Sequence, residues 1–154
     1  MSEALQILIT LLLAYVAWQN YKINDASFYI NKDKLRLDLF DRRYKVFDAC
    51  RNFFLSCGEK GSVVRDKFFK FTLNTSDAQF LFGKEIKSYI EEICDKSVRL
   101  MELETKFSKE DLGAVERKIL AEEYKTLSKW LATQSDHMSK IFSKYLHFAI
   151  DKHP

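Results

Sequence analysis

The side chains best suited to acid–base or metal chemistry are three histidines, His137, His147 and His153, in a chain of 154 residues. None of them follows a glutamate by three positions, as the Glu-x-x-His motif of a di-iron bundle requires. The H-E-x-x-H motif of zinc hydrolases, the G-x-S-x-G motif of serine hydrolases and a glycine-rich dinucleotide turn are also absent from the sequence. We therefore predict no catalytic residue, no metal site, no cofactor and no small-molecule substrate.

The cysteines and the paired carboxylates lead to the same expectation. Cys50, Cys57 and Cys94 lack C-x-x-C spacing, so they predict neither a zinc site nor a disulfide framework, and they suit a reducing cytosol. Cys50 falls on an apolar helix face, where a thiol behaves as a small hydrophobic group. The adjacent pairs Glu91–Glu92 and Glu122–Glu123 point about 100° apart on a helix, so their spacing does not form an acid–base dyad.

The strongest feature of the sequence is its apolar beginning. Residues 4–18 contain no charged side chain. A helix extended to Ile23 is about 30 Å long, which matches the hydrocarbon core of a bilayer. Tyr15, Trp18 and Tyr21 cluster at one end, where aromatic rings favour the headgroup level. We predict that residues 1–23 are a transmembrane anchor. Its membrane-facing side chains are Leu5, Ile7, Leu8, Ile9, Leu11, Leu12, Leu13, Tyr15, Val16 and Trp18.

Two other interpretations of this segment were weighed. A cleaved signal peptide is disfavoured, because the start Met-Ser-Glu has no positive charge and Tyr15-Val16-Ala17 is a poor cleavage site. A buried core helix stays open as an alternative, because the clean apolar run is short for a membrane span. Apolar residues occupy every face of the segment, however, so this helix would have no polar side to present to water.

Positive charge is concentrated just after the anchor. Residues 32–70 hold eleven Lys and Arg against six Asp and Glu. By the positive-inside rule this side faces the cytoplasm, so we expect the inner (plasma) membrane, with the N-terminus out and the remaining domain cytoplasmic. The membrane-proximal basic residues are Lys32, Lys34, Arg36, Arg42 and Arg43. Arg42 and Arg43 either contact lipid headgroups or form local ion pairs on a solvated face. Interspersed acidic residues argue against binding to nucleic acid.

The rest of the chain predicts an all-α protein. Four glycines and one terminal proline leave few breakers, which favours long helices. Residues 24–33 are either a hinge or a continuation of the anchor helix, and residues 34–154 form a cytosolic helical bundle. Within it, apolar positions repeat along 34–57, a turn follows at 58–62, and residues 63–73 form a short helix. A capping-box pattern at Ser76–Gln79 predicts the start of the next helix.

The clearest periodicity lies near the C-terminus, in a helix expected over residues 114–149, after an N-cap pattern at Ser108–Asp111. Its heptad positions alternate spacings of four and three and are Leu120, Tyr124, Leu127, Leu131, Gln134, Met138, Ile141, Tyr145 and Phe148. We expect this long helix to pack antiparallel in the bundle and to overhang it. Gln134 is interpreted as a core amide that sets the helix register, with a ligand contact inside the bundle as the alternative.

Two stretches carry a resemblance: KLRLDLFDRRYKVFDACRNFF from Lys34 and DAQFLFGKEIKSYIEEI from Asp77. They resemble small bacterial proteins that have one N-terminal membrane helix and a helical cytosolic domain. The resemblance covers about half of the chain. It implies the same fold and location, and no activity.

These observations predict a membrane-anchored module for protein–protein interaction, with the bilayer and a protein or a second copy as partners. The expected interaction residues are Gln134, Met138, Ile141, Tyr145 and Phe148. The alternative is a membrane-perturbing effector or small toxin, whose anchors cluster through the polar residues Gln6, Thr10 and Gln19. An enzyme is the third possibility.

Overall fold

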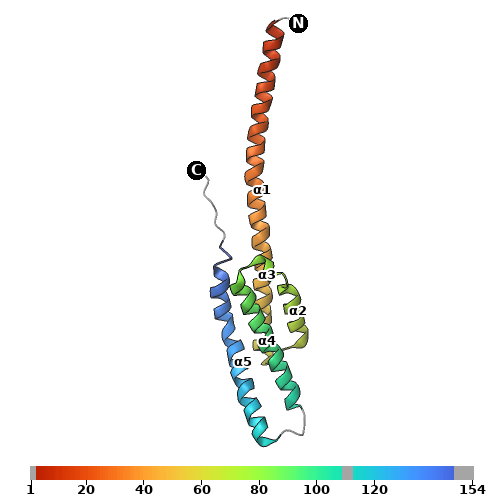
Figure 1. Ribbon diagram of the computed structural model, residues 1–154, viewed down its shortest axis with the longest axis vertical. Helices are drawn as coiled ribbons and strands as arrows, with labels where there is room; N and C mark the ends of the chain where they lie inside the picture. Colours follow the sequence, from red (N-terminus) through yellow and green to blue (C-terminus); the bar gives the residue numbers. More distant parts are fainter. Residues whose placement is uncertain (1–2, 109–112, 148–154) are drawn as a thin grey trace. The chain divides into compact units, whose positions relative to one another are not determined.

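The computed structural model describes residues 3–108 and 113–147, and all regular secondary structure in these ranges is helical (Figure 1). The chain divides into two compact units, residues 1–39 and residues 40–154. Helix α1, Glu3–Lys60, begins in the first unit and ends in the second. The second unit also contains α2, Arg65–Thr75, α3, Ala78–Leu81, α4, Lys84–Phe107, and α5, Ala114–Ser143.

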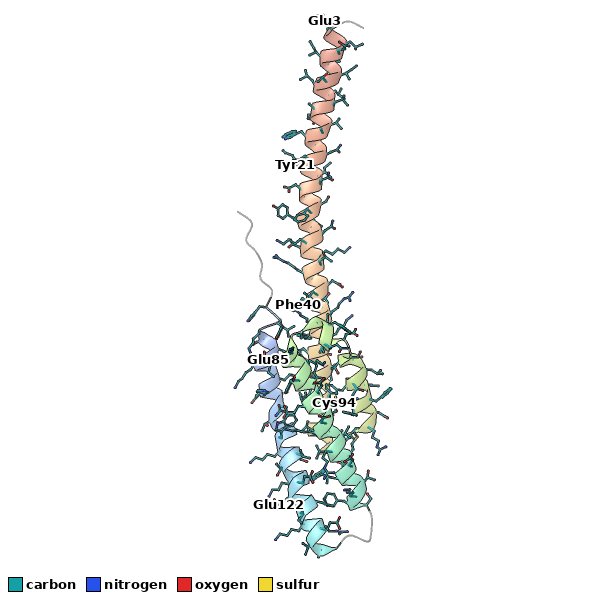
Figure 2. All side chains as sticks on the ribbon, in the orientation of Figure 1. Glu3, Tyr21, Phe40, Glu85, Cys94 and Glu122 are labelled. Atoms are coloured by element: carbon teal, nitrogen blue, oxygen red, sulfur yellow. The ribbon has the colours of Figure 1, made fainter. Side chains whose placement is uncertain are left out.

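The first unit is a helix with outward-facing side chains. Figure 2 marks Glu3 and Tyr21 on this part of α1, where side chains project from all sides of the helix. An apolar window near its N-terminus is long enough to cross a membrane, and no residue of that window is buried within the chain. Residues 24–33 are helical and lie within α1.

The second unit has a core rich in aromatic side chains, as the thirteen phenylalanines of the sequence predict. The Phe53 ring from α1 stacks on the Phe71 ring from α2 at a centroid distance of 4.7 Å. At the opposite end of the core, the Phe142 ring from α5 meets the Phe82 ring edge-on at 5.3 Å. The stripe predicted for residues 34–57 is buried from Val46 onward, whereas the side chain of Leu39 is exposed.

Two predicted helix boundaries are wrong between residues 58 and 83. Gly58 is still helical, and α1 ends at Lys60 because Gly61 adopts φ +67°, a left-handed conformation that glycine tolerates best. The capping box at Ser76 does not form, since the Ser76 hydroxyl donates to the Leu73 carbonyl oxygen and caps the end of α2. The single helix predicted from Ser76 is instead divided into α3 and α4 by Gly83, which is the N-cap residue of α4.

Helices α4 and α5 pack against each other in opposite directions. The start of α4 contacts the residue after the end of α5, through Glu85 and Lys144. Later residues of α4 contact progressively earlier residues of α5: Tyr89 contacts Gln134, and Arg99 contacts Glu123. Helix α5 begins at Ala114, as predicted, but ends at Ser143 rather than near residue 149. Beyond it, the backbone N–H groups of Tyr145 and Leu146 both donate to the Phe142 carbonyl oxygen, which closes the helix in a tight turn.

Candidate interaction surfaces

The predicted anchor presents its apolar side chains to the surroundings. The ten residues named as membrane-facing are between 44% and 64% exposed. Such a length of exposed apolar surface is costly in water and favourable in hydrocarbon. The arrangement therefore suits a bilayer or a protein partner.

The polar side chains of the anchor are bonded within its own helix. The Thr10 hydroxyl donates to the Gln6 carbonyl oxygen at 2.9 Å, and the Gln19 amide donates to the Tyr15 hydroxyl at 2.9 Å. The Lys22 ammonium lies 4.1 Å from the centre of the Trp18 ring, a cation–π contact at the end of the apolar run. Bonds of this kind lower the cost of placing polar groups in hydrocarbon.

Among the basic residues predicted to lie near the membrane, Arg43 has a different role. Lys32, Lys34, Arg36 and Arg42 are exposed, whereas Arg43 is partly buried within the second unit. Its guanidinium donates to the carbonyl oxygen of Leu81 at 2.9 Å and to that of Tyr145 at 3.4 Å. Both alternatives for Arg43, a lipid headgroup contact and a local ion pair, are replaced by bonds to protein carbonyls.

The interaction surface predicted on α5 is mostly covered by the chain itself. Gln134, Met138 and Ile141 are buried in the core, and Tyr145 is partly buried beside Phe82. Phe148 lies outside the described residues. The four described positions were expected to overhang the bundle, but they belong to its core or pack against it.

Gln134 has a mixed environment in the core. Its amide nitrogen donates to the Trp130 carbonyl oxygen at 3.0 Å, and its own backbone carbonyl accepts from the Tyr89 hydroxyl at 3.3 Å. The Gln134 side-chain oxygen and the Ser97 hydroxyl are buried without a hydrogen-bond partner within the described part of the chain. The bond from Tyr89 joins α4 to the backbone of α5, whereas the bond from the Gln134 side-chain amide stays within α5.

An open groove lies between α2 and α4, with a volume of about 560 Å³. Its apolar lining comes from Phe68, Val98 and Met101, and Arg65 and Lys106 add positive charge. The groove lining also holds Glu102 and Thr105, and the Thr105 hydroxyl donates to the Met101 carbonyl oxygen at 2.8 Å. The apolar side chains of the lining suit the binding of an apolar side chain.

The thiols are poor nucleophiles in the folded protein. Burial raises the pKa of Cys50 to about 12 and that of Cys57 to about 11, and burial likewise raises the pKa of the half-buried Cys94. Since thiolate is the reactive form, these shifts suppress reactivity at neutral pH. Across the described residues, His, Cys, Asp and Glu side chains form no group of three or more that could hold a metal ion.

Comparison of the chain with protein-family models, with curated proteins and with solved structures finds no match. Within residues 24–39 the sequence predictions named only the basic side chains, yet the apolar residues Phe28, Ile30, Leu35 and Leu37 are also exposed there. Their apolar character and spacing were visible in the sequence and could have identified this surface.

Proposed function

We propose that this chain is a single-pass, membrane-anchored helical module for protein–protein interaction in the inner membrane of a bacterium. The observation that carries the proposal is the exposed apolar helix of residues 4–23, which has the length and composition of a membrane span. The folded unit that follows supplies surfaces for binding, in particular the groove between α2 and α4. The resemblance to small single-pass bacterial proteins supports the same fold and location.

The orientation proposed here has the N-terminus outside and the folded unit in the cytosol. The support for it is the excess of Lys and Arg within residues 32–70. The folded unit is proposed to be an antiparallel bundle, because α4 and α5 run in opposite directions and the heptad positions of α5 face the core.

Polar contacts between anchors would have favoured the alternative, a membrane-perturbing effector. The hydroxyl of Thr10 and the amide of Gln19 are instead engaged inside their own helix. Both donors thus have partners within their own helix, so the interaction module is the better supported function.

The proposal is tested by alkaline carbonate extraction of the full chain with a C-terminal tag, combined with protease treatment of spheroplasts. The protein should remain in the membrane pellet, and the tag should be protected. A Leu8→Arg/Leu12→Arg variant should move to the supernatant, because each arginine near the centre of a span costs about 3 kcal/mol.

A matched control places the same two changes at exposed leucines of the folded unit, Leu55→Arg/Leu73→Arg. That variant should remain in the pellet. Extraction of the unsubstituted protein by carbonate would show that residues 4–23 are not a membrane anchor.

A further inference from the structure

A heptad repeat runs along the first unit of α1. Ten consecutive positions follow one another at alternating spacings of four and three residues. Eight of them are apolar, and Gln19 and Asp33 are polar. We call these positions the α1 seam: Leu5, Ile9, Leu12, Val16, Gln19, Ile23, Ala26, Ile30, Asp33 and Leu37. A period of 3.5 residues is the signature of a coiled coil rather than of a single amphipathic helix.

The α1 seam continues beyond the membrane segment with its side chains uncovered. Ile23 is 60% exposed, Ile30 is 66% exposed and Leu37 is 48% exposed. The spacing keeps its phase from Leu5 to Leu37, so one face of the helix carries the whole repeat. Exposed apolar side chains at this period, outside the hydrocarbon, require a second helix to cover them.

The residue types at the two seam positions favour a pair of helices. Ile9, Val16, Ile23 and Ile30 occupy the heptad position a in four consecutive repeats. Side chains branched at Cβ in this position favour parallel two-stranded coiled coils when leucine occupies position d, as Leu5 and Leu12 do here. The helix that best complements the α1 seam has the same repeat in the same register, and a second copy of the chain supplies such a helix.

Charge at the single acidic seam position fits a second copy as well. Asp33 occupies position d, and Lys34 occupies the neighbouring position e. In a parallel pair the side chain at d packs beside position e of the other helix, so Asp33 would meet the Lys34 ammonium of the second copy. On its own helix, Arg36 already lies 3.9 Å from the Asp33 carboxylate. The negative charges of the two Asp33 side chains would thus be balanced by Lys34 of the other helix and Arg36 of the same helix.

Another exposed apolar row on the same helix does not fit this pairing. Tyr21, Phe28 and Leu35 recur only every seventh residue. The positions three residues after each are the polar Asn24, Asn31 and Asp38, so the row lacks the second member of a coiled-coil repeat. It therefore provides a control surface of similar exposure.

We propose that a second copy of this chain pairs with the α1 seam in a parallel two-stranded coiled coil. The inference rests on the proposed function in one respect: two copies anchored in one membrane by the same end are parallel. It also moves the self-association surface from α5, where the heptad positions are buried, to α1.

The pairing is tested by disulfide cross-linking of the full chain in native membranes. Equivalent a positions of a parallel pair lie close enough for a disulfide, which needs Cα atoms about 4.4–6.8 Å apart, whereas Phe28 lies on the outer face. Under mild oxidation, Ile30→Cys should give a dimer band at least about tenfold stronger than that of Phe28→Cys. The unsubstituted chain, with its three native cysteines, sets the background.

A second comparison separates stable pairing from random collision. With Leu37→Cys as the reporter, Ile23→Asn/Ile30→Asn should abolish the dimer band, and Tyr21→Asn/Phe28→Asn should leave it intact. Equal yields from Ile30→Cys and Phe28→Cys, or a Leu37→Cys band that survives the Ile23→Asn/Ile30→Asn change, would overturn the proposal.

Failure of pairing and failure of anchoring give different results. Protein that stays in the carbonate pellet without a seam-specific band retains the proposed anchor and refutes the coiled coil. Protein that is extracted refutes the anchor. The same Cys comparison on the extracted protein then decides the pairing, because Ile30 and Leu37 lie beyond the proposed span.

Discussion

At the scale of single residues, Arg43 joins three segments of the folded unit. Besides its bonds to the carbonyl oxygens of Leu81 and Tyr145, its guanidinium carbon lies 5.7 Å from the centres of both the Phe82 and Tyr145 rings. A planar cation with several donors can serve two carbonyls and two rings at once, which an ammonium group cannot.

Replacement of this side chain should therefore be costly. We expect Arg43→Ala to lower the free energy of unfolding by about 2 kcal/mol, because two carbonyl oxygens lose a charged donor. Arg43→Lys should recover only part of that loss. The measurement is thermal unfolding of the full chain in detergent, followed by circular dichroism. Lys45→Ala, at an exposed position two residues further along α1, is the control and should change stability by less than about 0.5 kcal/mol. Similar losses in both variants would contradict the role of Arg43.

Local contacts between residues could be predicted from spacing, and contacts between helices could not. The i, i+4 spacing of Glu92 and Lys96 predicts an ion pair, and Lys96 Nζ lies 2.6 Å from a Glu92 carboxylate oxygen. The same spacing would pair Arg99 with Asp95, but Arg99 donates to both carboxylate oxygens of Glu123 on α5, at 2.6 and 2.8 Å. The i, i+4 rule describes one helix surface, whereas the partner of Arg99 depends on how two helices pack.

At the scale of elements, the end of α1 depends on two glycines with opposite requirements. Gly58 is helical, and a Cβ atom added there would meet no heavy atom within 4 Å. Gly61 stands at φ +67°, and its N–H donates to the Cys57 carbonyl oxygen at 2.9 Å. The first position tolerates any helix-forming residue, and the second needs glycine.

Alanine should consequently have opposite effects at these two positions. Gly58→Ala should raise the free energy of unfolding by up to about 1 kcal/mol, because alanine loses less backbone entropy in a helix. Gly61→Ala should lower it by about 1 kcal/mol or more, because a Cβ atom is disfavoured in the left-handed region. Each variant serves as the control for the other in urea unfolding of the full chain. Changes of the same sign would show that the helix does not end as described.

The contact between α4 and α5 has a pH dependence of predictable sign. Hydrogen bonds from Arg99 hold the pKa of Glu123 below its ordinary value of 4.5. The folded state thus favours the carboxylate, so its contribution is complete above pH 4.5 and is lost as the pH falls through the lowered pKa. Glu123→Gln should lower Tm slightly at pH 7, and its Tm should converge with that of the wild type in acid. Glu122→Gln, one residue away and exposed, should follow the wild-type profile throughout.

Apolar spacing predicted the helices of the folded unit better than it predicted their ends. The periodic pattern of α5 continues through Tyr145, which is why the helix was expected to extend further. The structure ends it at Ser143, where Arg43 bonds the Tyr145 carbonyl oxygen and the Tyr145 ring packs on Phe82. Tertiary contacts therefore overrule the local signal at this boundary.

At the scale of the whole molecule, the distribution of charge is expected to set the orientation in the membrane. Lys32→Gln/Lys34→Gln/Arg36→Gln combined with Glu3→Arg should convert a uniform orientation into a mixed one, because charges within about 15–20 residues of a span determine topology. Protease protection of a C-terminal tag measures the fraction of molecules in each orientation.

A control for that experiment changes charge far from the span. Arg117→Gln/Lys118→Gln/Lys125→Gln removes three exposed basic residues and should leave the tag fully protected. If both sets of changes leave the orientation uniform, charge does not determine it.

The sequence could not show which of its two heptad repeats is available to a partner. The repeats of α1 and α5 have the same spacing. The heptad positions of α5 between residues 131 and 141 are buried in the core, whereas Ile23 and Ile30 in α1 are exposed. An apolar heptad pattern predicts that one face of a helix packs against another helix. Only the folded structure shows whether that other helix belongs to the same chain. The apolar helix near the N-terminus was easier to predict, because composition alone indicates a helix long and apolar enough to cross a membrane.

The position of Arg43 has a mechanical consequence. This one guanidinium fastens the segment of α1 that brings the chain into the folded unit to the turn that follows α5. A force applied along α1 would act directly on the contact between α1 and the turn after α5. The start and the end of the folded unit would then unfold together, and α5 would stay packed as long as the Arg43 bonds hold.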